Sequence, residues 1–284
     1  MKRTRLFLAM TIVAMTAASC GTKEETPKIL VLYYSQTGNT KAVAEQIARR
    51  LGADIEEIVA VNPYDPDFQA TIQRCKKDQA QGVLPEINPM KADLSKYDVI
   101  FLGYPVWFGT YAPPIITWLT SVDLSGKKIV PFCTFGSGGL ESSVAELRKC
   151  QPKADVLDGY GVRAARLEAM PKEVEQFLIS NGFIEGEYTA PEPFGEQHEV
   201  SADEAAIFDA AVDGYPMLHA KAKTVAVRTI VDGTEYLFTA EDMPREDRVP
   251  AEGDKKSDMP PAGELQVYVT VANGQAPVFT KVVR

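Results

Sequence analysis

Six polar or small residues between a strand pattern and a helix pattern are the first candidates for chemistry. They follow an apolar run, 29–34, and precede an amphipathic helical pattern over 40–51. Such a turn presents unpaired backbone N–H groups and the positive end of the helix dipole, which together attract anions. Glycine allows close approach of the backbone. The candidate anion-binding residues are Ser35, Gln36, Thr37, Gly38, Asn39 and Thr40.

This loop contains no cationic side chain. Asn39 stands where a nucleoside-triphosphate loop has its lysine, and the Gly-x-Gly-x-x-Gly pattern of dinucleotide-binding loops is absent. The expected ligand group is therefore a small phosphate monoester that neutral donors hold. The alternative is a helix start that binds nothing.

Two later stretches add a surface for a flat ring. The segment 103–111 (GYPVWFGTY) holds four aromatic residues, which are costly to expose together. The segment 134–139 (TFGSGG) offers hydroxyls and flexible backbone, which suit the polar edge of a heterocycle. An anion loop, an aromatic wall and a glycine-rich edge together indicate a mononucleotide with a large planar ring.

The elements that position these stretches alternate between strand and helix. Apolar runs predict strands at 28–34, 54–61, 98–103, 128–135 and 155–160. Helical patterns follow them at 40–51, 68–80, 114–122, 140–149 and 171–181. Continuous apolar strands separated by helices are typical of a doubly wound α/β domain, in which helices cover both faces of a parallel sheet.

Residues 28–182 resemble the flavodoxins, in particular those with the pattern Tyr-Ser-x-Thr-Gly-Asn-Thr. The stretches YYSQTGNT, YDVIFLGYPVWFGTYAPPI and SGKKIVPFCTFGSGG carry the resemblance in order and spacing. It implies a five-stranded sheet of order 2-1-3-4-5 and non-covalently bound FMN, with its phosphate on residues 35–40. The resemblance also implies that the ring and ribityl chain lie among Pro105, Val106, Trp107, Phe108, Thr134, Phe135, Gly136, Ser137 and Gly138.

The chain divides into five parts. We expect a signal peptide at 1–19, a tether at 20–27, the flavodoxin-like domain at 28–184, a linker at 185–200 and a small α+β domain at 201–284. In the last part, Ser201 and Glu204 predict a capping box on a helix over 201–212. Asp-Gly at 232–233 and Asn-Gly at 273–274 predict two hairpins. No chemical constellation shows the role of this domain.

The N-terminal residues have the pattern of an export signal. Three basic residues precede an apolar run, 6–18, and small residues precede Cys20. This resembles a bacterial lipobox, which implies cleavage before Cys20 and its lipidation; an ordinary signal peptide is the alternative. The lipid would anchor the protein to a membrane of the bacterial cell envelope, facing the periplasm or exported to the outer membrane.

Charge narrows the classes of partner. The formal net charge is −9, and removal of Lys2, Arg3 and Arg5 with the signal changes it to −12. Binding of nucleic acid demands cations, so this acidic composition disfavours nucleic acid as a partner and suits redox partner proteins with basic surfaces. Neither the two histidines nor the remaining cysteines, Cys75, Cys133 and Cys150, have a metal-ligand spacing, although two of these cysteines could pair.

These observations favour an FMN-binding electron carrier with no catalytic side chain of its own. Two other functions stay open at this point. One is an NAD(P)H-dependent flavin or quinone oxidoreductase, which usually needs a basic contact for the dinucleotide, and no basic cluster lies near the three loops. The other is a non-redox, lipid-anchored binding module.

Overall fold

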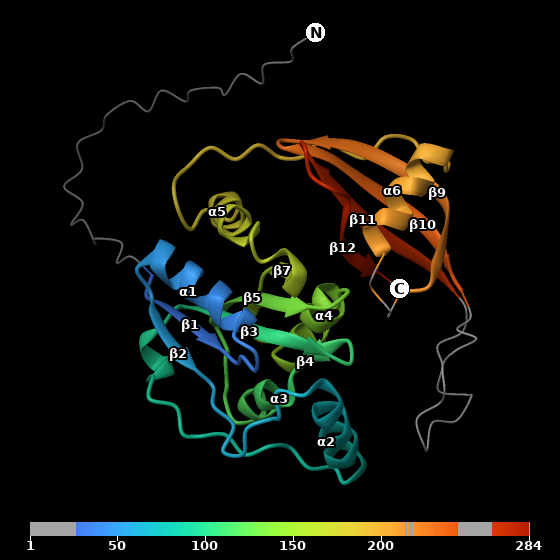
Figure 1. Cartoon of the computed structure of the whole chain (residues 1–284). Coiled ribbons are helices and arrows are strands. Elements are labelled where there is room, and N and C mark those ends of the chain that lie inside the picture. Colours follow the sequence, from blue (N-terminus) through green and yellow to red (C-terminus); the bar gives the residue numbers. More distant parts are fainter. Residues whose placement is uncertain (1–26, 214, 216–217, 244–262, 284) are drawn as a thin grey trace, which may run out of the picture.

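The computed structural model describes residues 27–213, 215, 218–243 and 263–283. These residues form a larger domain of helices around a mostly parallel sheet and a smaller domain with an antiparallel sheet (Figure 1). The predicted signal peptide at 1–19, Cys20 and the tether up to residue 26 lie outside the described residues. None of the helices in the described part has both the length and the apolar character that a membrane span requires.

Seven strands make the sheet of the larger domain. In chain order they are β1 (Ile29–Tyr33), β2 (Asp54–Glu57), β3 (Val99–Trp107), β4 (Thr110–Tyr111), β5 (Lys128–Phe135), β6 (Asp155–Val156) and β7 (Tyr160–Arg163). The strand order is β2-β1-β3-β5-β6, with β7 beside the far end of β5 and β4 in a hairpin with β3. This confirms the expected order, since β5 is the fourth strand predicted and β6 and β7 together are the fifth.

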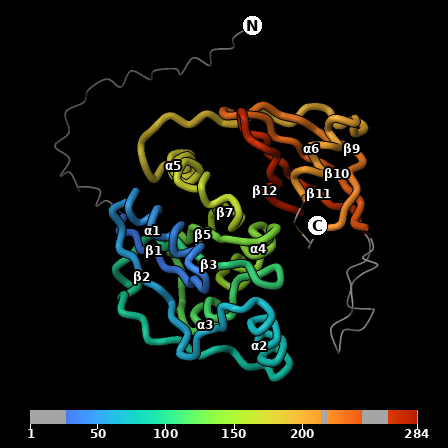
Figure 2. The backbone as a smooth tube through the Cα atoms, in the orientation of Figure 1, coloured from blue at the N-terminus to red at the C-terminus, as the bar shows by residue number. Residues whose placement is uncertain are grey.

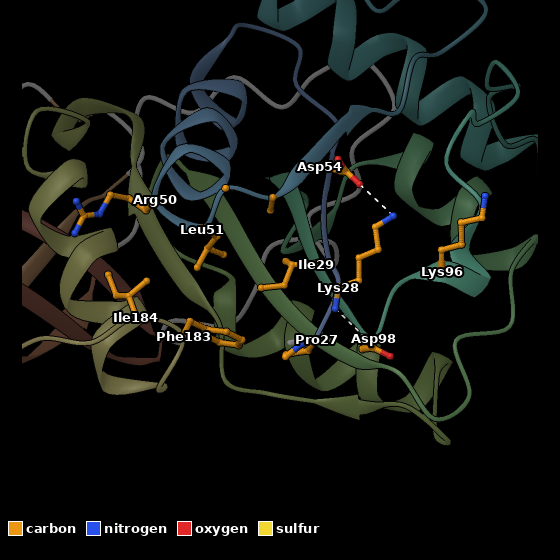
Figure 3. A pocket seen from close by; sticks show the side chains of 12 residues that line it. Pro27, Lys28, Ile29, Arg50, Leu51, Asp54, Lys96, Asp98, Phe183 and Ile184 are labelled. Carbon is orange, nitrogen blue, oxygen red and sulfur yellow. Dashed lines mark hydrogen bonds and ion pairs between the residues drawn. The ribbon is translucent and has the colours of Figure 1, made fainter. Parts of the chain in front are cut away.

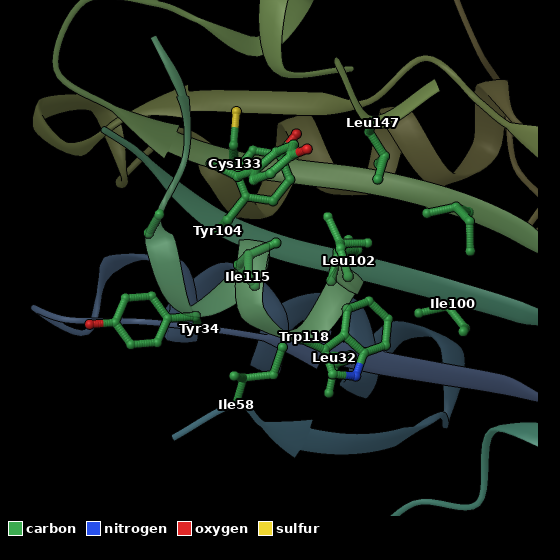
Figure 4. Close-up of a cluster of buried hydrophobic side chains, with 14 of the residues drawn as sticks. Leu32, Tyr34, Ile58, Ile100, Leu102, Tyr104, Ile115, Trp118, Cys133 and Leu147 are labelled. Atoms are coloured by element: carbon green, nitrogen blue, oxygen red, sulfur yellow. The ribbon is translucent and has the colours of Figure 1, made fainter. Parts of the chain in front are cut away.

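Helices cover both faces of this sheet. They are α1 (Asn39–Leu51), α2 (Phe68–Ala80), α3 (Pro113–Thr120), α4 (Leu140–Cys150) and α5 (Met170–Ser180), with short 3-10 turns η1 (Leu94–Lys96) and η2 (Ala164–Arg166). Alternate residues of a strand point to opposite faces. Leu30 and Leu32 therefore belong to the same buried cluster as Trp118 of α3, whereas Val31 packs with α1 and α5. Figure 4 shows Leu32 beside Trp118.

The fifth predicted strand, 155–160, is split in two, and Pro131 is the reason. The carbonyl of Ile129 accepts a hydrogen bond from the N–H of Leu157, so the main-chain groups of Ile129 point toward β6 and β7. The main-chain groups of residues two apart in a strand point to the same side, so the nitrogen of Pro131 faces these strands too. Proline has no N–H to donate at that position. Pairing of β5 stops after Val156 and resumes at Tyr160.

The smaller domain is a five-stranded antiparallel sheet with one helix. Its elements are β8 (His198–Glu199), α6 (Ala202–Val212), β9 (Ala220–Ile230), β10 (Gly233–Asp242), β11 (Glu264–Ala272) and β12 (Val278–Val283), with the strand order β12-β11-β10-β9-β8. The capping box at Ser201 and both hairpins are confirmed. Residues 185–200, expected to be a linker, end in β8, which adds to the edge of β9.

The two domains meet along β12, the edge strand of the second sheet (Figure 2). The main-chain N–H of Val282 donates to the carbonyl of Ser137, and Lys281 pairs with Glu141 of α4. A second ion pair, Lys172 with Asp232, joins α5 to the turn between β9 and β10. The second domain therefore lies against the loop between β5 and α4.

Candidate flavin site

The three polar or aromatic stretches meet at the carboxyl edge of the parallel sheet. They follow β1, β3 and β5, which are neighbours in the sheet, and such an edge is where doubly wound proteins bind ligands. A cavity of about 700 Å³ lies there. Its lining includes Gln36 from the first loop, residues 106–109 from the second and residues 136–139 from the third.

The first loop has free donors for an anion. Helix α1 begins after Gly38, whose φ of 88° lies in the left-handed region, and no side chain caps its first turn. The Oγ atom of Ser35 is buried and has no hydrogen-bond partner among the described residues. Because a buried unpaired hydroxyl is costly, this orphan atom fits a site whose missing partner is a bound group. The loop therefore suits a phosphate.

Other side chains of this loop hold the protein together. The Nε2 atom of Gln36 donates to Thr71 Oγ1 at 2.8 Å and also to the carbonyl of Asp65. Thr40 Oγ1 and Thr134 Oγ1 share a buried hydrogen bond of 2.8 Å, which ties the first loop to the end of β5. The side-chain amide of Gln36 is therefore already in use, and only its main-chain N–H can be offered to an anion. The Thr40–Thr134 hydrogen bond fixes the distance between the first loop and the third.

Replacement of Ser35 by alanine should separate binding from stability. We expect Ser35→Ala to weaken FMN binding about tenfold, because a hydrogen bond to a charged group contributes about 1.5 kcal/mol. Stability without ligand should stay equal or rise, since the variant loses an unpartnered buried hydroxyl. Fluorescence titration with FMN measures the first effect and urea denaturation the second.

Riboflavin is the matched control for this variant because it lacks the phosphate. Its affinity should be the same for Ser35→Ala and for the unaltered protein. Equal losses of riboflavin and FMN affinity would contradict the assignment of Ser35 to the phosphate end.

The second loop is a tight hairpin turn between β3 and β4. Phe108 and Gly109 form it with φ values of 51° and 81°, while Trp107 pairs with Thr110. A bulky residue in this left-handed region costs about 1–2 kcal/mol. The Phe108 side chain is also 65% exposed. Strain of this kind concentrates at ligand sites, which agrees with a role for Phe108 over the cavity.

Trp107 is the central aromatic residue of this wall. Its ring meets Tyr34 and Tyr64 edge to face, at centroid distances of 6.0 and 5.0 Å. The guanidinium of Arg74 lies 3.9 Å from the Tyr64 ring centroid. Burial raises the pKa of Tyr34 and raises that of Tyr64 to about 12, so both phenols are neutral near pH 7. The wall behind Trp107 is therefore aromatic and uncharged apart from Arg74.

The third loop offers backbone and not an aromatic ring. Gly136, Ser137 and Gly138 line the cavity. Thr134 is buried and bonded to Thr40, and the Phe135 ring is buried in the core, close to Gly161. The structure thus places seven of the fifteen residues expected at the site in the cavity lining, namely Gln36, Val106, Trp107, Phe108, Gly136, Ser137 and Gly138. The other expected residues of the first loop, with Pro105, Thr134 and Phe135, are not part of that lining.

Several cavity residues were not expected from the sequence. Phe68, Thr71 and Ile72 line it from one face of α2, and their spacing of three and four residues is the signal that could have shown this. Glu141 and Ser142 come from the first turn of α4. The last group belongs to the second domain, for which the local sequence has no signal; it comprises Tyr215, Val282 and Val283.

Other places in the structure carry less chemistry. A cavity of about 830 Å³ lies at the opposite edge of the sheet (Figure 3), where Lys28 contacts Asp54 and Asp98. The cysteines at 75, 133 and 150 are free. Within the described ranges, no three histidine, cysteine, aspartate or glutamate side chains gather as metal ligands would.

The fold and the site define a mononucleotide-binding protein of the doubly wound α/β class. Comparison with protein families is more specific, because the flavodoxin family matches residues 28–176. The chain belongs to the flavodoxin family. FMN is the cofactor of this family, and the orphan Ser35 hydroxyl, the uncapped α1 and the aromatic cavity fit it.

The individual relatives carry two kinds of name. Flavodoxin 1 of Shigella flexneri is 24% identical over 165 residues, which cover 56% of this chain and 76% of that protein. A protein of Azorhizobium caulinodans named NAD(P)H dehydrogenase (quinone) is 36% identical over 129 residues. That match covers 41% of this chain and 62% of the relative, so the chain spans less than two thirds of its length.

Two solved structures are also similar to this chain. A putative flavoprotein from Bacteroides eggerthii is 29% identical, with a TM-score of 0.49, and the match covers 55% of this chain and 98% of that one. A flavoprotein from Lactobacillus acidophilus, solved in complex with FMN, is 30% identical with a TM-score of 0.43. That match covers 52% of this chain and 98% of the other. Both matches span little more than half of the present chain.

Proposed function

We propose that this protein is an electron carrier that uses FMN and is attached to a membrane through a lipid on Cys20. The observation that carries the redox part is the cavity at the carboxyl edge, with an uncharged anion loop and an aromatic wall. No histidine or cysteine among the described residues lines this cavity. The chain therefore offers a place for a redox group, and neither imidazole nor thiol is present in the part of that lining that the structure describes.

Each part of the site has one task in this proposal. The Ser35 hydroxyl and the N–H groups at the start of α1 would hold the phosphate of FMN, and Trp107 and Phe108 would cover its ring. When bound, FMN supplies the ability to accept and release single electrons. The apolar walls disfavour added negative charge in the cavity, as burial does for any charge, and so favour a low potential for the last electron taken up.

Stepwise reduction tests this function. Purified protein should be yellow, release FMN in acid and take up electrons in two separate steps during an anaerobic reductive titration. It should pass them to a one-electron acceptor protein without any nicotinamide cofactor. A colourless protein that does not bind added FMN would refute the carrier function.

A second candidate function is an NAD(P)H-dependent quinone oxidoreductase. The name of the Azorhizobium caulinodans relative favours it. Against it, the cavity has no lysine or arginine among its described lining residues, and Glu141 of the lining is paired with Lys281. Rapid bleaching of the flavin by NADPH alone would favour the enzyme, whereas bleaching only with an added reductase would favour the carrier.

Membrane attachment has its own test. Replacement of Cys20 by serine removes the sulfur that would be lipidated, so most of the protein should move from the membrane fraction to the soluble fraction. Mass spectrometry of the unaltered protein should find acyl chains on Cys20. The absence of acyl chains on Cys20 of the unaltered protein would contradict a lipid anchor. The net charge of −12 after cleavage further supports partners with basic surfaces, whose association should weaken as salt rises.

A further inference from the structure

The second domain contacts the third loop of the proposed flavin site directly. The N–H of Val282 donates to the carbonyl of Ser137 at 2.6 Å. Since β12 is the edge strand of its sheet, this N–H faces the first domain and is not needed for pairing with β11. The hydrogen bond is therefore a dedicated link between the domains.

Arg163 makes a second link to the same loop. This buried side chain at the end of β7 donates from Nε to the carbonyl of Gly136 at 2.7 Å and from Nη1 to the carbonyl of Phe279 at 2.8 Å. Its guanidinium also lies 3.4 Å from the centroid of the Phe279 ring. Burial lowers the pKa of Arg163 to about 10, so the group is charged at neutral pH. One side chain thus joins the loop to β12.

Two glycines of this loop, at 136 and 138, lie directly against the second domain. A Cβ atom at Gly138 would overlap the carbonyl oxygen of Val282, and one at Gly136 would lie 3.0 Å from the hydroxyl of Tyr215. Neither glycine has a positive φ, so backbone conformation does not explain them. The loop is shaped to let the second domain approach closely.

The same segments of the second domain reach the cavity. Tyr215, Val282 and Val283 line it together with Trp107 and Phe108 of the second loop. Lys281 pairs with Glu141, which also lines the cavity, and so places a positive charge at its border. The second domain is consequently a wall of the cavity as well as a support for one of its loops.

We infer that the C-terminal domain is a built-in part of the flavin site, and that its docking on residues 136–138 sets the affinity for FMN. This rests on the proposed flavin site. By linkage, a domain that strengthens FMN binding is itself held more tightly when FMN is bound. The domain of unknown role thereby gains a positioning function toward the cofactor.

Two substitutions in the second domain test this inference. Val282→Pro removes one N–H at an edge position, where proline is tolerated, and keeps an apolar side chain at the cavity. Tyr215→Ala removes the aromatic side chain that meets Arg163 and Gly136. We expect the dissociation constant for FMN to rise about fivefold in the first variant, as for one hydrogen bond, and about tenfold in the second.

Lys172→Ala is the matched control because it breaks another contact between the domains. The Lys172–Asp232 pair is exposed, and neither residue lines the flavin cavity. FMN affinity should therefore equal that of the unaltered protein. Hydrogen exchange adds a readout independent of affinity: FMN should slow exchange along β12 in the full chain and in Lys172→Ala, and less so in Val282→Pro.

The outcomes are distinct. Weaker FMN binding in Val282→Pro and Tyr215→Ala, with none in Lys172→Ala, supports the inference. Unchanged affinity in both folded variants, or equal losses in all three, overturns it. If Val282→Pro does not fold, Tyr215→Ala and hydrogen exchange in the unaltered protein decide. Failure of the unaltered protein to bind FMN would instead refute the proposed function.

Discussion

Trp107→Ala should weaken FMN binding on the order of 30-fold, the largest loss we expect from a single side chain of the cavity. Stacking of a flat base on an aromatic side chain contributes about 1–3 kcal/mol, and a loss of about 2 kcal/mol corresponds to that factor. Trp107 lines the cavity while Tyr34 and Tyr64 hold its ring from behind. Fluorescence titration with FMN measures the effect.

The comparison with riboflavin shows which end of the ligand Trp107 meets. Trp107→Ala should weaken FMN and riboflavin equally, since both carry the same ring, whereas Ser35→Ala should weaken FMN alone. Trp107→Phe keeps an aromatic face, so its loss of FMN-binding free energy should be less than a third of the loss in Trp107→Ala. If riboflavin binds Trp107→Ala as well as it binds the unaltered protein, Trp107 is not part of the ring site.

Gly103→Ala should lower the free energy of unfolding by about 3 kcal/mol, at the upper end for insertion of one methyl group into a packed core. Gly103 lies in the centre of β3, beside Tyr33 of β1 and Phe132 of β5. A Cβ atom there would overlap the tip of the Phe132 ring, which is fully buried. Urea denaturation of the apoprotein measures the change.

The double variant Gly103→Ala/Phe132→Leu tests the cause. Phe132→Leu alone should cost stability by leaving a void, but when Gly103→Ala has added a methyl group there, the smaller side chain relieves the overlap. The double variant should therefore be at least about 1 kcal/mol more stable than the sum of the single effects predicts. Strictly additive effects would show that the Phe132 ring is not what excludes a side chain at position 103.

The sequence was informative where local pattern and burial agree. The strand at 128–135 and the helix at 68–80 were predicted to the residue. The first is an uninterrupted apolar run, and the second is a helical pattern that follows a turn rich in proline and aspartate. The prediction of one strand over 155–160 missed the break, although Pro131 was visible in the sequence. The proline interrupts the strand that pairs with β5, not β5 itself. Which strand that is becomes known only from the strand pairing in the structure.

For the site, the loops were predictable and the direction of side chains was not. The anion loop and the hairpin at Trp107 follow from composition between recognisable elements. Phe135 was expected at the ring, but its side chain turns into the core, where Gly161 leaves room for it. The contribution of Tyr215 depends on contacts across some 80 residues of chain, for which a single sequence holds no local sign.

The chain enters β1 at the edge of the sheet opposite to the proposed flavin cavity. Pro27 and Lys28 lie beside the cavity at the amino edge, and the aromatic cavity lies beyond the opposite ends of the strands. The seven residues from 21 to 27 reach about 25 Å at most. A lipid on Cys20 would thus hold the amino edge of the sheet near the membrane and turn the proposed flavin cavity toward the aqueous compartment. In this orientation the cavity would meet proteins in solution more readily than molecules dissolved in the bilayer.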